Sequence, residues 1–342
     1  MKRLMYCLLI LIFVLGFTVA NSFGRETTGK PQFWPRHISW SSPSGSKWIT
    51  AVGFTGLIQK YTGISSSALG PTGGGVADLR NLKANKAEIA WGSNPSVRDG
   101  WLGIGYSKSE GPQKWIRCLS GGYLAYWYIL ASNKSGIVNF RDIRGHRWSG
   151  DVMVGSDVTD QVREGLLKIY GMTKTDYKGI PVTKFSEVVA MLKEGRADVG
   201  SFFGGIPSPQ ALELVTSMDI AWISMGSEEA SRVAEVMPGH EPGVIPAGKY
   251  KGQEKGVVFV SHMTIPVVSA ELHQEVVYEI MKSLFDHPEE MEAIHPSIKD
   301  FARKSTSSQV TVPYHDGAIK YYKEKGLWTS NLETHQRKLL SQ

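Results

Sequence analysis

The chain has 342 residues, of which 42% are hydrophobic, and its formal net charge at pH 7 is +6. This length suits about two domains of ordinary size with well-packed cores, so the composition excludes a disordered protein. Lysine and arginine are scattered along the chain without a basic run of interleaved aromatic residues, which argues against a nucleic-acid partner.

The N-terminal segment has the pattern of a secretory signal peptide. Lys2 and Arg3 precede an uncharged, apolar run over residues 4–20 that ends in a small residue suited to cleavage. We therefore expect residues 1–20 to be a signal peptide, residues 21–34 to be a flexible tail, and the mature protein to be periplasmic. A retained N-terminal membrane anchor is the alternative, because this run reaches the lower limit of about 17 residues for a spanning helix.

Cysteine and histidine usage gives no sign of a disulfide or a metal site. Cleavage would remove Cys7 and leave Cys118 alone, so no intramolecular disulfide is expected, and it would lower the net charge from +6 to +4 by removing Lys2 and Arg3. The nine histidines and two cysteines show no HxH, HExxH or CxxC spacing. We expect neither a bound metal nor another cofactor.

Short apolar strands and amphipathic helices alternate from about residue 36. The pattern predicts a strand over residues 38–41, a helix over residues 47–61 and a strand over residues 63–69. Ser46 is the expected N-cap of the helix. The candidate core positions of this helix are Val52, Leu57, Ile58 and Tyr61.

Residues 70–95 combine a glycine-rich turn, a helix that begins near Val76, a buried strand over residues 89–91 and a second polar turn over residues 92–95. The glycines at 73–75 leave backbone N–H groups open at the start of the helix, where anions bind readily. Ligands of open α/β sheets collect at the carboxyl ends of the strands. The two loops are therefore expected to form half of a small-molecule site.

The middle of the chain repeats this plan. The apolar run at 123–132 predicts a buried strand or a crossing between domains, and the strand at 151–154 leads through a glycine turn to a helix at 158–170 that ends at Gly171. A helix at 184–194 and a strand at 198–203 follow. The similarity between the two regions suggests two lobes built alike.

The last part of the chain is expected to return to the first lobe. Residues 264–268 could carry it back, and helices are predicted over residues 272–285 and 318–325. Alternating strands and helices imply parallel sheets with right-handed crossovers. The predicted fold is α/β with two lobes, two hinge crossings and a cleft between them. The expected boundaries are 35–125 for the first part of lobe 1, 126–260 for lobe 2 and 261–342 for the return to lobe 1.

Residues 36–326 resemble the TAXI-type solute receptors of tripartite ATP-independent periplasmic (TRAP) transporters. The match is strongest in PTGGGVADLRNLKANKAEIAW at 71–91, in VPYHDGAIKYYKEKG at 312–326, and in IPAGKYKGQ followed by VVYEIMKSLFDHPEEM. The resemblance implies a type II periplasmic-binding architecture with a glutamate-like or other small carboxylate ligand between the lobes. It also implies a membrane permease, driven by an ion gradient, as the partner.

The resemblance places the ligand-binding residues in five loops. The family's first loop falls on residues 45–49, its second loop falls on the glycine-rich turn, and its polar pair falls on residues 93–94. The second lobe adds two more loops, a glycine-containing turn and the end of the strand that follows. The candidate residues, together with Ser44 next to the first loop, are Ser44, Gly45, Ser46, Lys47, Trp48, Thr72, Gly73, Gly74, Ser93, Asn94, Gly155, Ser156, Asp157, Phe203 and Gly204.

Some of these residues depart from the family pattern or have a simpler interpretation. Lys47 replaces a hydroxyl residue and Trp48 a tyrosine, so Lys47 is either a solvated charge or the partner of a carboxylate, and Trp48 either core packing or a ligand contact. Trp91 suits the core. The glycines at 73–75 could simply form a tight turn. Asp157, an acid where the family favours small or neutral residues, suits a helix start better than a ligand contact.

Three patterns of enzymes are present but incomplete. GVIPAGK at 243–249 has the spacing of a phosphate-binding loop, but Tyr250 follows in place of Ser or Thr. Ser44 and Lys47 fit the S-x-x-K pattern and residues 134–136 fit the third element of penicillin-recognising enzymes, whereas the S-x-N element between them is missing. No G-x-S-x-G elbow occurs, so we do not expect an enzyme.

The sequence therefore predicts an exported, hinged, two-lobe binding protein whose lobes close on a small, anionic or zwitterionic organic solute. A TRAP permease is the expected partner. The alternatives are the binding subunit of an ABC-type importer, a sensor, and a penicillin-recognising serine acyl-transfer enzyme.

Overall fold

The computed structural model describes residues 31–303 and 306–342, so the predicted signal peptide, Cys7 and most of the predicted tail lie outside the described residues. Residues Pro35–Gln342 form one compact unit. No helix in the described part of the chain is both long and apolar enough to cross a membrane.

The strands of this unit form one sheet in the order β2-β1-β3-β11-β5-β8-β6-β7. The strands β1 (His37–Pro43), β2 (Ser65–Thr72) and β3 (Ile89–Ser93) pair in parallel at one end. The strands β6 (Arg147–Met153), β7 (Lys178–Val182) and β8 (Val199–Gly204) pair in parallel at the other end. We call the first group with its helices the first lobe, and the second group with its helices the second lobe.

Two long strands join these lobes. β11 (Val257–Ser269) pairs antiparallel with β3 at its end and with β10 (Glu241–Ile245) at its beginning, while β5 (Tyr123–Ser132) pairs antiparallel with β11 and then with β8. The prediction of parallel pairing is thus correct within each lobe and wrong at the junction, because the chain crosses there along strands. The short strands β4 (Ile116–Cys118) and β9 (Ile220–Trp222) extend this junction.

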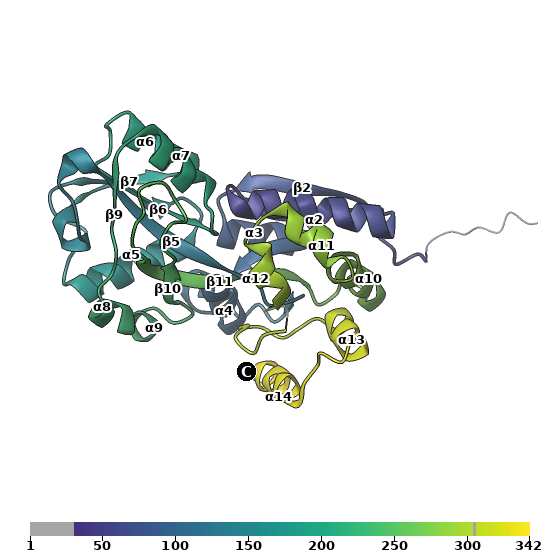
Figure 1. The fold of residues 1–342 in the computed structure, drawn as a ribbon. Coiled ribbons are helices and arrows are strands. Elements are labelled where there is room, and N and C mark those ends of the chain that lie inside the picture. The colour runs from purple at the N-terminus through teal and green to yellow at the C-terminus, as the bar shows by residue number, and fades with distance from the viewer. Residues whose placement is uncertain (1–30, 304–305) are drawn as a thin grey trace, which may run out of the picture. The chain divides into compact units, whose positions relative to one another are not determined.

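Helices cover the sheet of each lobe (Figure 1). The helices of the first lobe are α2 (Ser46–Thr62), α3 (Gly75–Lys83), α4 (Asn94–Leu102), α10 (Gln274–Phe285), α11 (Pro288–Ile294), α12 (Ile298–Arg303), α13 (Asp316–Glu324) and α14 (Ser330–Leu340). The helices of the second lobe are α5 (Asp157–Tyr170), α6 (Phe185–Lys193), α7 (Pro209–Ser217), α8 (Ser227–Ser231) and α9 (Val233–Val236). Short 3-10 helices lie at Gly105–Ser107, Asn133–Ser135 and Phe140–Ile143.

Aromatic side chains build much of the core in each lobe. In the first lobe, the rings of Trp40, Phe54 and Trp91 lie 5.0–5.9 Å apart, and all three side chains are fully buried, which confirms the core interpretation of Trp91. The second lobe buries Trp148 against the rings of Phe140 and Tyr177. Such packing gives each lobe a rigid scaffold behind its loops.

Along α2, two of the four predicted core residues are buried. Leu57 and Ile58 face the interior, whereas Val52 is 49% exposed and Tyr61 is 36% exposed. The prediction is wrong for Val52 and Tyr61 because only one side of this helix packs against the sheet and α10. The hydroxyl of Tyr61 instead donates to a carboxylate oxygen of Glu290.

Two predicted boundaries near the carboxyl ends of strands are also wrong. Gly45, with φ at 83°, is the N-cap of α2, and Ser46 is its first helical residue. The predicted polar turn at 92–95 is absent: Ser93 ends β3, and α4 follows at once with Pro95 in its first turn. Proline is well tolerated in a first turn, which explains why the helix can begin there.

Candidate functional site

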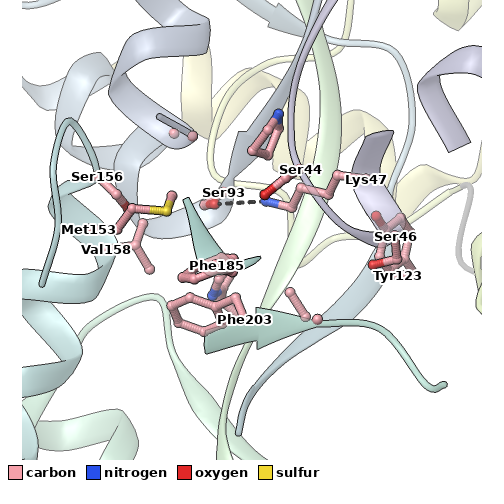
Figure 2. Close-up of a pocket in the computed structure, with 16 residues that line it drawn as sticks. Ser44, Ser46, Lys47, Ser93, Tyr123, Met153, Ser156, Val158, Phe185 and Phe203 are labelled. Atoms are coloured by element: carbon pink, nitrogen blue, oxygen red, sulfur yellow. Dashed lines mark hydrogen bonds between the residues drawn. The ribbon is translucent and has the colours of Figure 1, made fainter. Parts of the chain in front are cut away.

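A small cavity of about 30 Å³ lies between the two lobes, where loops from both meet the two crossing strands (Figure 2). The first lobe lines it with Pro43, Ser44, Ser46, Lys47, Gly74, Gly75 and Ser93. The second lobe lines it with Met153, Ser156, Val158, Phe185, Phe203 and Gly204. The crossing strands add Tyr123, Ala125 and His262.

The lobes are closed on each other in this structure, where hydrogen bonds join them, and the space left between them is small. A water molecule needs about 10–15 Å³ measured in this way, so the cavity has room for about two waters. An organic molecule can therefore enter only if the lobes separate or the lining side chains move.

The sequence-predicted residues divide into two groups. Those that line the cavity are Ser44, Ser46, Lys47, Gly74, Ser93, Ser156, Phe203 and Gly204. Those that lie outside its lining are Gly45, Trp48, Thr72, Gly73, Asn94, Gly155 and Asp157. The first group comes from all five predicted loops, which the fold brings to the same edge of the sheet.

Several residues of the second group have structural partners. The Thr72 hydroxyl donates to Asp78 (2.7 Å), and Nδ2 of Asn94 donates to the carbonyl oxygen of Gln309 (2.9 Å). Asp157 is the first residue of α5 and accepts a hydrogen bond from another helix rather than facing the cavity. The sequence-based interpretation of Asp157 as a helix-start acid agrees with this position.

Sequence reasoning missed half of the lining. The missed residues are Pro43, Gly75, Tyr123, Ala125, Met153, Val158, Phe185 and His262. Tyr123 and Ala125 begin the aromatic run at 123–132, for which the sequence left open a buried strand or a crossing between domains; the crossing interpretation places them next to the cleft. His262 carries no such signal, because it is one residue inside a 13-residue apolar strand.

Lys47 is the cation of this cavity. Its Nζ donates to Oγ of Ser93, 3.3 Å away, as Figure 2 shows. Burial lowers the pKa of Lys47 to about 8, and the charge of nearby Asp78 opposes part of this shift. At neutral pH, Lys47 is therefore mostly protonated but poorly solvated, a state that an incoming anion would stabilise.

Asp78 lies behind Lys47, outside the cavity lining. Its Oδ1 accepts hydrogen bonds from the hydroxyls of Ser41 and Thr72, each at 2.7 Å. Burial raises the pKa of Asp78 to about 6, although both hydrogen bonds and the charge of Lys47 act in the other direction. Lys47 thus has a nearby counter-charge without a direct ion pair.

His262 is a deeply buried polar side chain in the lining of the cavity. It is 1% exposed, and neither ring nitrogen has a hydrogen-bond partner among the described residues. Burial, and then the charge of Lys47, lower the pKa of His262 well below its usual value, so the ring is neutral. The ring of Phe203 packs edge-on against it at 4.5 Å. A buried polar ring without partners is costly unless something else satisfies it.

Four helices of the two lobes begin at the cavity without a side-chain cap. Their N-cap residues are Gly45 for α2, Gly74 for α3, Ser93 for α4 and Ser156 for α5, and none of them accepts a capping hydrogen bond. The first N–H groups of a helix lack partners within the helix, and the helix dipole is positive there. Their convergence makes the potential at the cavity favourable for an anion.

Hydrogen bonds join the lobes around this cavity. The Ser96 hydroxyl donates to Oδ1 of Asp157 (2.7 Å), and Nε2 of Gln161 donates to Oδ2 of Asp99 (3.2 Å). The backbone N–H of Gly205 donates to the Ser46 hydroxyl (3.1 Å). These contacts can exist only while the lobes are closed, so they contribute to the stability of the closed form.

The structure also bears on the enzyme-like patterns. Residues 243–245 belong to strand β10, and the loop that follows in the described chain is not a strand-to-helix turn of the kind a phosphate-binding loop requires. Ser44 and Lys47 both line the cavity, but the hydrogen-bond partner of Lys47 Nζ is Ser93.

A profile of the NMT1-like family matches residues 41–326. Among solved structures, the periplasmic binding protein BugD has a TM-score of 0.52 at 10% identity, with 90% of this chain and 97% of that chain covered. The periplasmic aliphatic sulphonate-binding protein SsuA from Escherichia coli has a TM-score of 0.44 at 12% identity (88% and 92% covered). The substrate-binding protein of an amino acid ABC transporter has a TM-score of 0.43 at 9% identity (78% and 99% covered).

The match to BugD shows that the fold is that of the two-lobe periplasmic binding proteins, as the α/β architecture with two crossing strands predicts. The family profile extends over most of the chain, from the end of β1 to the end of α13, and so includes both lobes and every residue that lines the cavity. This chain belongs to the NMT1-like family.

Proposed function

We propose that the protein is an extracytoplasmic solute-binding receptor that captures a small solute between its lobes and delivers it to a membrane permease. The observation that carries this proposal is the small cavity between the lobes, which residues of both lobes line, Lys47 among them, and at which four helices without side-chain caps begin. The fold shared with the periplasmic binding protein BugD supports the same function.

Binding operates through closure of the lobes. A solute enters while the lobes are apart, contacts Lys47 and the serine hydroxyls of the first lobe, and gains the contacts of the second lobe when the cleft closes. Only the closed form offers both sets of contacts, so the solute shifts the population toward it. The candidate residues that line the cavity touch the solute, whereas Asp157 and Gly73 act at its edge.

A TRAP permease is the proposed partner. The TAXI-like segments at 71–91 and 312–326 support this assignment. The alternatives are an ABC-type importer and a sensor. The neighbouring genes distinguish them, because a large multi-span permease implies the TRAP system and an ATPase implies the ABC system.

Export to the periplasm rests on the N-terminal sequence pattern. N-terminal sequencing of the protein from its native host tests it. A mature chain that begins near Asn21 would support a cleaved signal peptide, and an intact N-terminus would support a membrane anchor.

The serine acyl-transfer enzyme is the second candidate, because Ser44 and Lys47 face the same cavity. A labelled penicillin should acylate Ser44 if the protein is such an enzyme. The receptor proposal predicts that the protein stays unlabelled, since Lys47 is engaged by Ser93.

Mass spectrometry of small molecules released by denaturing the natively purified protein tests the receptor proposal. A stoichiometric organic solute that raises the melting temperature of the refolded protein with its concentration would support it. A natively purified protein that contains no solute, and that no organic or amino acid stabilises, would contradict it.

A further inference from the structure

The two sides of the cavity differ in chemistry. The first lobe presents a cation, serine hydroxyls and helix N-termini, whereas the second lobe presents mainly the apolar side chains of Met153, Val158, Phe185 and Phe203. Figure 2 shows these four side chains on the side of the cavity opposite Ser44. Closure therefore brings a polar, positive surface against an apolar one.

The polar side fits one anionic group. Lys47 supplies a charge-assisted donor, and the first N–H groups of α2, α3 and α4 supply backbone donors around it. Among the described residues of the lining, Lys47 is the one charged side chain. A second negative group on the ligand would have no cation of its own, and Asp78 already balances part of the Lys47 charge.

The lining offers no partner for an ammonium group. No Asp or Glu is among the described residues that line the cavity. Asp78 lies outside the lining, with Oδ1 engaged by Ser41 and Thr72 and with Oδ2 buried without a hydrogen-bond partner in the described chain. Asp157 also lies outside it and is engaged by Ser96 and Gln161. Burying an ammonium without a carboxylate or several acceptors is strongly unfavourable. The lining therefore disfavours a free α-amino acid.

His262 adds a neutral polar contact. It is 1% exposed, it lines the cavity, and its ring nitrogens are without partners in the described chain. A neutral imidazole can donate from one nitrogen and accept at the other, which suits a keto or hydroxyl oxygen better than a charged group.

We propose that the ligand of this cavity is a small monocarboxylic acid with an apolar body and without an amino group, such as an aliphatic 2-oxo acid. The carboxylate binds at Lys47 and the helix N-termini, the oxo group lies near His262, and the apolar body packs against Phe185 and Phe203. Because the cavity has room for about two waters as it stands, the lobes close on the acid at a wider separation than in this structure. This inference rests on the proposed receptor function and restricts its substrate class.

Isothermal titration of the full mature protein, refolded to remove any resident solute, tests the inference with four probes. 4-Methyl-2-oxopentanoate has all the required features, L-leucine replaces its oxo group by an ammonium, 2-oxoglutarate adds a second carboxylate, and 4-methyl-2-pentanone lacks the carboxylate. We expect 4-methyl-2-oxopentanoate to bind at least tenfold more tightly than each of the other three.

Tighter binding of L-leucine or 2-oxoglutarate would overturn the inference and leave the receptor function standing. A protein that binds none of the four probes, and no solute from its native host, would instead contradict the receptor function itself. The two failures are therefore distinguishable.

A matched pair of variants locates the effect. Met153→Glu places a carboxylate on the apolar side of the cavity, whereas Val154→Glu adds the same charge next to it on a side chain that is 57% exposed. We expect Met153→Glu to lower the preference for 4-methyl-2-oxopentanoate over L-leucine at least fivefold, and Val154→Glu to leave it unchanged. Equal preferences in both variants and the unmodified protein would overturn the proposed binding mode.

Discussion

The helices that begin at the cavity differ from those that begin elsewhere in the capping of their N-termini. Among the described helices of nine residues or more, the four that begin at the cavity, α2, α3, α4 and α5, have no side-chain cap, and neither has α6, whose first residue Phe185 also lines it. The other four, α7, α10, α13 and α14, supply no lining residue and are capped by Ser208, His273, His315 and Thr329. An N-cap stabilises a protein by about 1 kcal/mol. The cavity helices lack this stabilisation, and at the N-termini of α2, α3 and α4 no N-cap side chain occupies the first N–H groups.

The largest expected loss of affinity comes from removing Lys47, the cation of the cavity. We expect Lys47→Met to weaken binding of the solute about 100-fold, because a charge-assisted contact in a closed site is lost. The melting temperature should stay the same or rise, since Lys47 is poorly solvated and has no ion pair in the described chain. Titration calorimetry and thermal unfolding measure the two quantities.

Lys60→Met is the matched control. Lys60 lies on the same helix but at the surface, where it pairs with Glu290 at 2.6 Å. Lys60→Met should leave the affinity for the solute unchanged. Equal losses of affinity in both variants would mean that the overall charge, rather than the position of Lys47, attracts the solute.

The second prediction concerns the contact between the glycine-rich turn and the second lobe. A Cβ added at Gly73 would lie 2.8 Å from the carbonyl oxygen of Val154, across the closed cleft. Gly73→Ala should therefore oppose closure and weaken binding about 10–100-fold, since overpacking costs about 1–3 kcal/mol. Small-angle scattering with saturating solute should show a smaller compaction than in the unmodified protein.

Gly56→Ala serves as the control for this variant. A Cβ at Gly56, on helix α2, meets no atom within 4 Å. The substitution should raise the stability by about 0.5–1 kcal/mol and leave binding unchanged. An unaltered affinity in Gly73→Ala would contradict the closed arrangement of the two lobes.

The third prediction is a pH dependence of closure. Burial, opposed by the Ser96 hydrogen bond and assisted by the charge of Asp99, raises the pKa of Asp157 to about 6 in the closed form. Tyr106 also lies near Asp157, and its pKa is raised too. In an open form, water would return the Asp157 pKa toward 3.9. The closed form then binds the proton more tightly, so closure is favoured below about pH 4 and loses this advantage as the pH rises through 6.

We expect the affinity for a fully ionised solute to fall about tenfold between pH 5 and pH 7.5, less than the full pKa difference because pH 5 lies between the two pKa values. Asp157→Asn should flatten this profile. Asp160→Asn, on the exposed side of the same helix, should preserve it. A flat profile in the unmodified protein would contradict the role of Asp157 at the interface.

The smallest expected effect is the loss of stability when the side-chain cap of one helix is removed. It allows a capped helix to be compared directly with an uncapped one. Thr329→Ala removes the hydroxyl that accepts from the Leu332 N–H at the start of α14, so it should lower the free energy of unfolding by about 1 kcal/mol without changing binding. Ser93→Ala should weaken binding and leave the free energy of unfolding unchanged, because Ser93 makes no capping bond but contacts Lys47 at the cavity. Chemical denaturation and calorimetry of both variants test the contrast.

The sequence predicted the parts of the fold that depend on local patterns. The strand at 123–132 agrees with β5, and the helix ending at Gly171 agrees with α5, because apolar runs and a C-terminal glycine are local signals. The helix α4 was missed, since Asn94 and Pro95 suit a turn as well as a helix start. The antiparallel pairing of β11 with β3 and β5 depends on long-range contacts that periodicity does not reveal.

The candidate site was predicted only in part for the same reason. The loops with Ser46, Gly74 and Ser93 were identified by the resemblance and by their positions after strands. His262 and Phe185 reach the cavity through the crossing strand and the second lobe, so no local pattern marks them. The Ser96 to Asp157 hydrogen bond requires the two lobes to be closed, which the sequence cannot show.

A crystal structure of the protein with the most tightly bound monocarboxylate tests the central claim most directly. We predict that the ligand lies in the cavity between the lobes, with its carboxylate within hydrogen-bond distance of Lys47 Nζ and its apolar part against Phe185 and Phe203. A ligand bound outside this cavity, or one whose carboxylate faces the second lobe away from Lys47, would contradict the account.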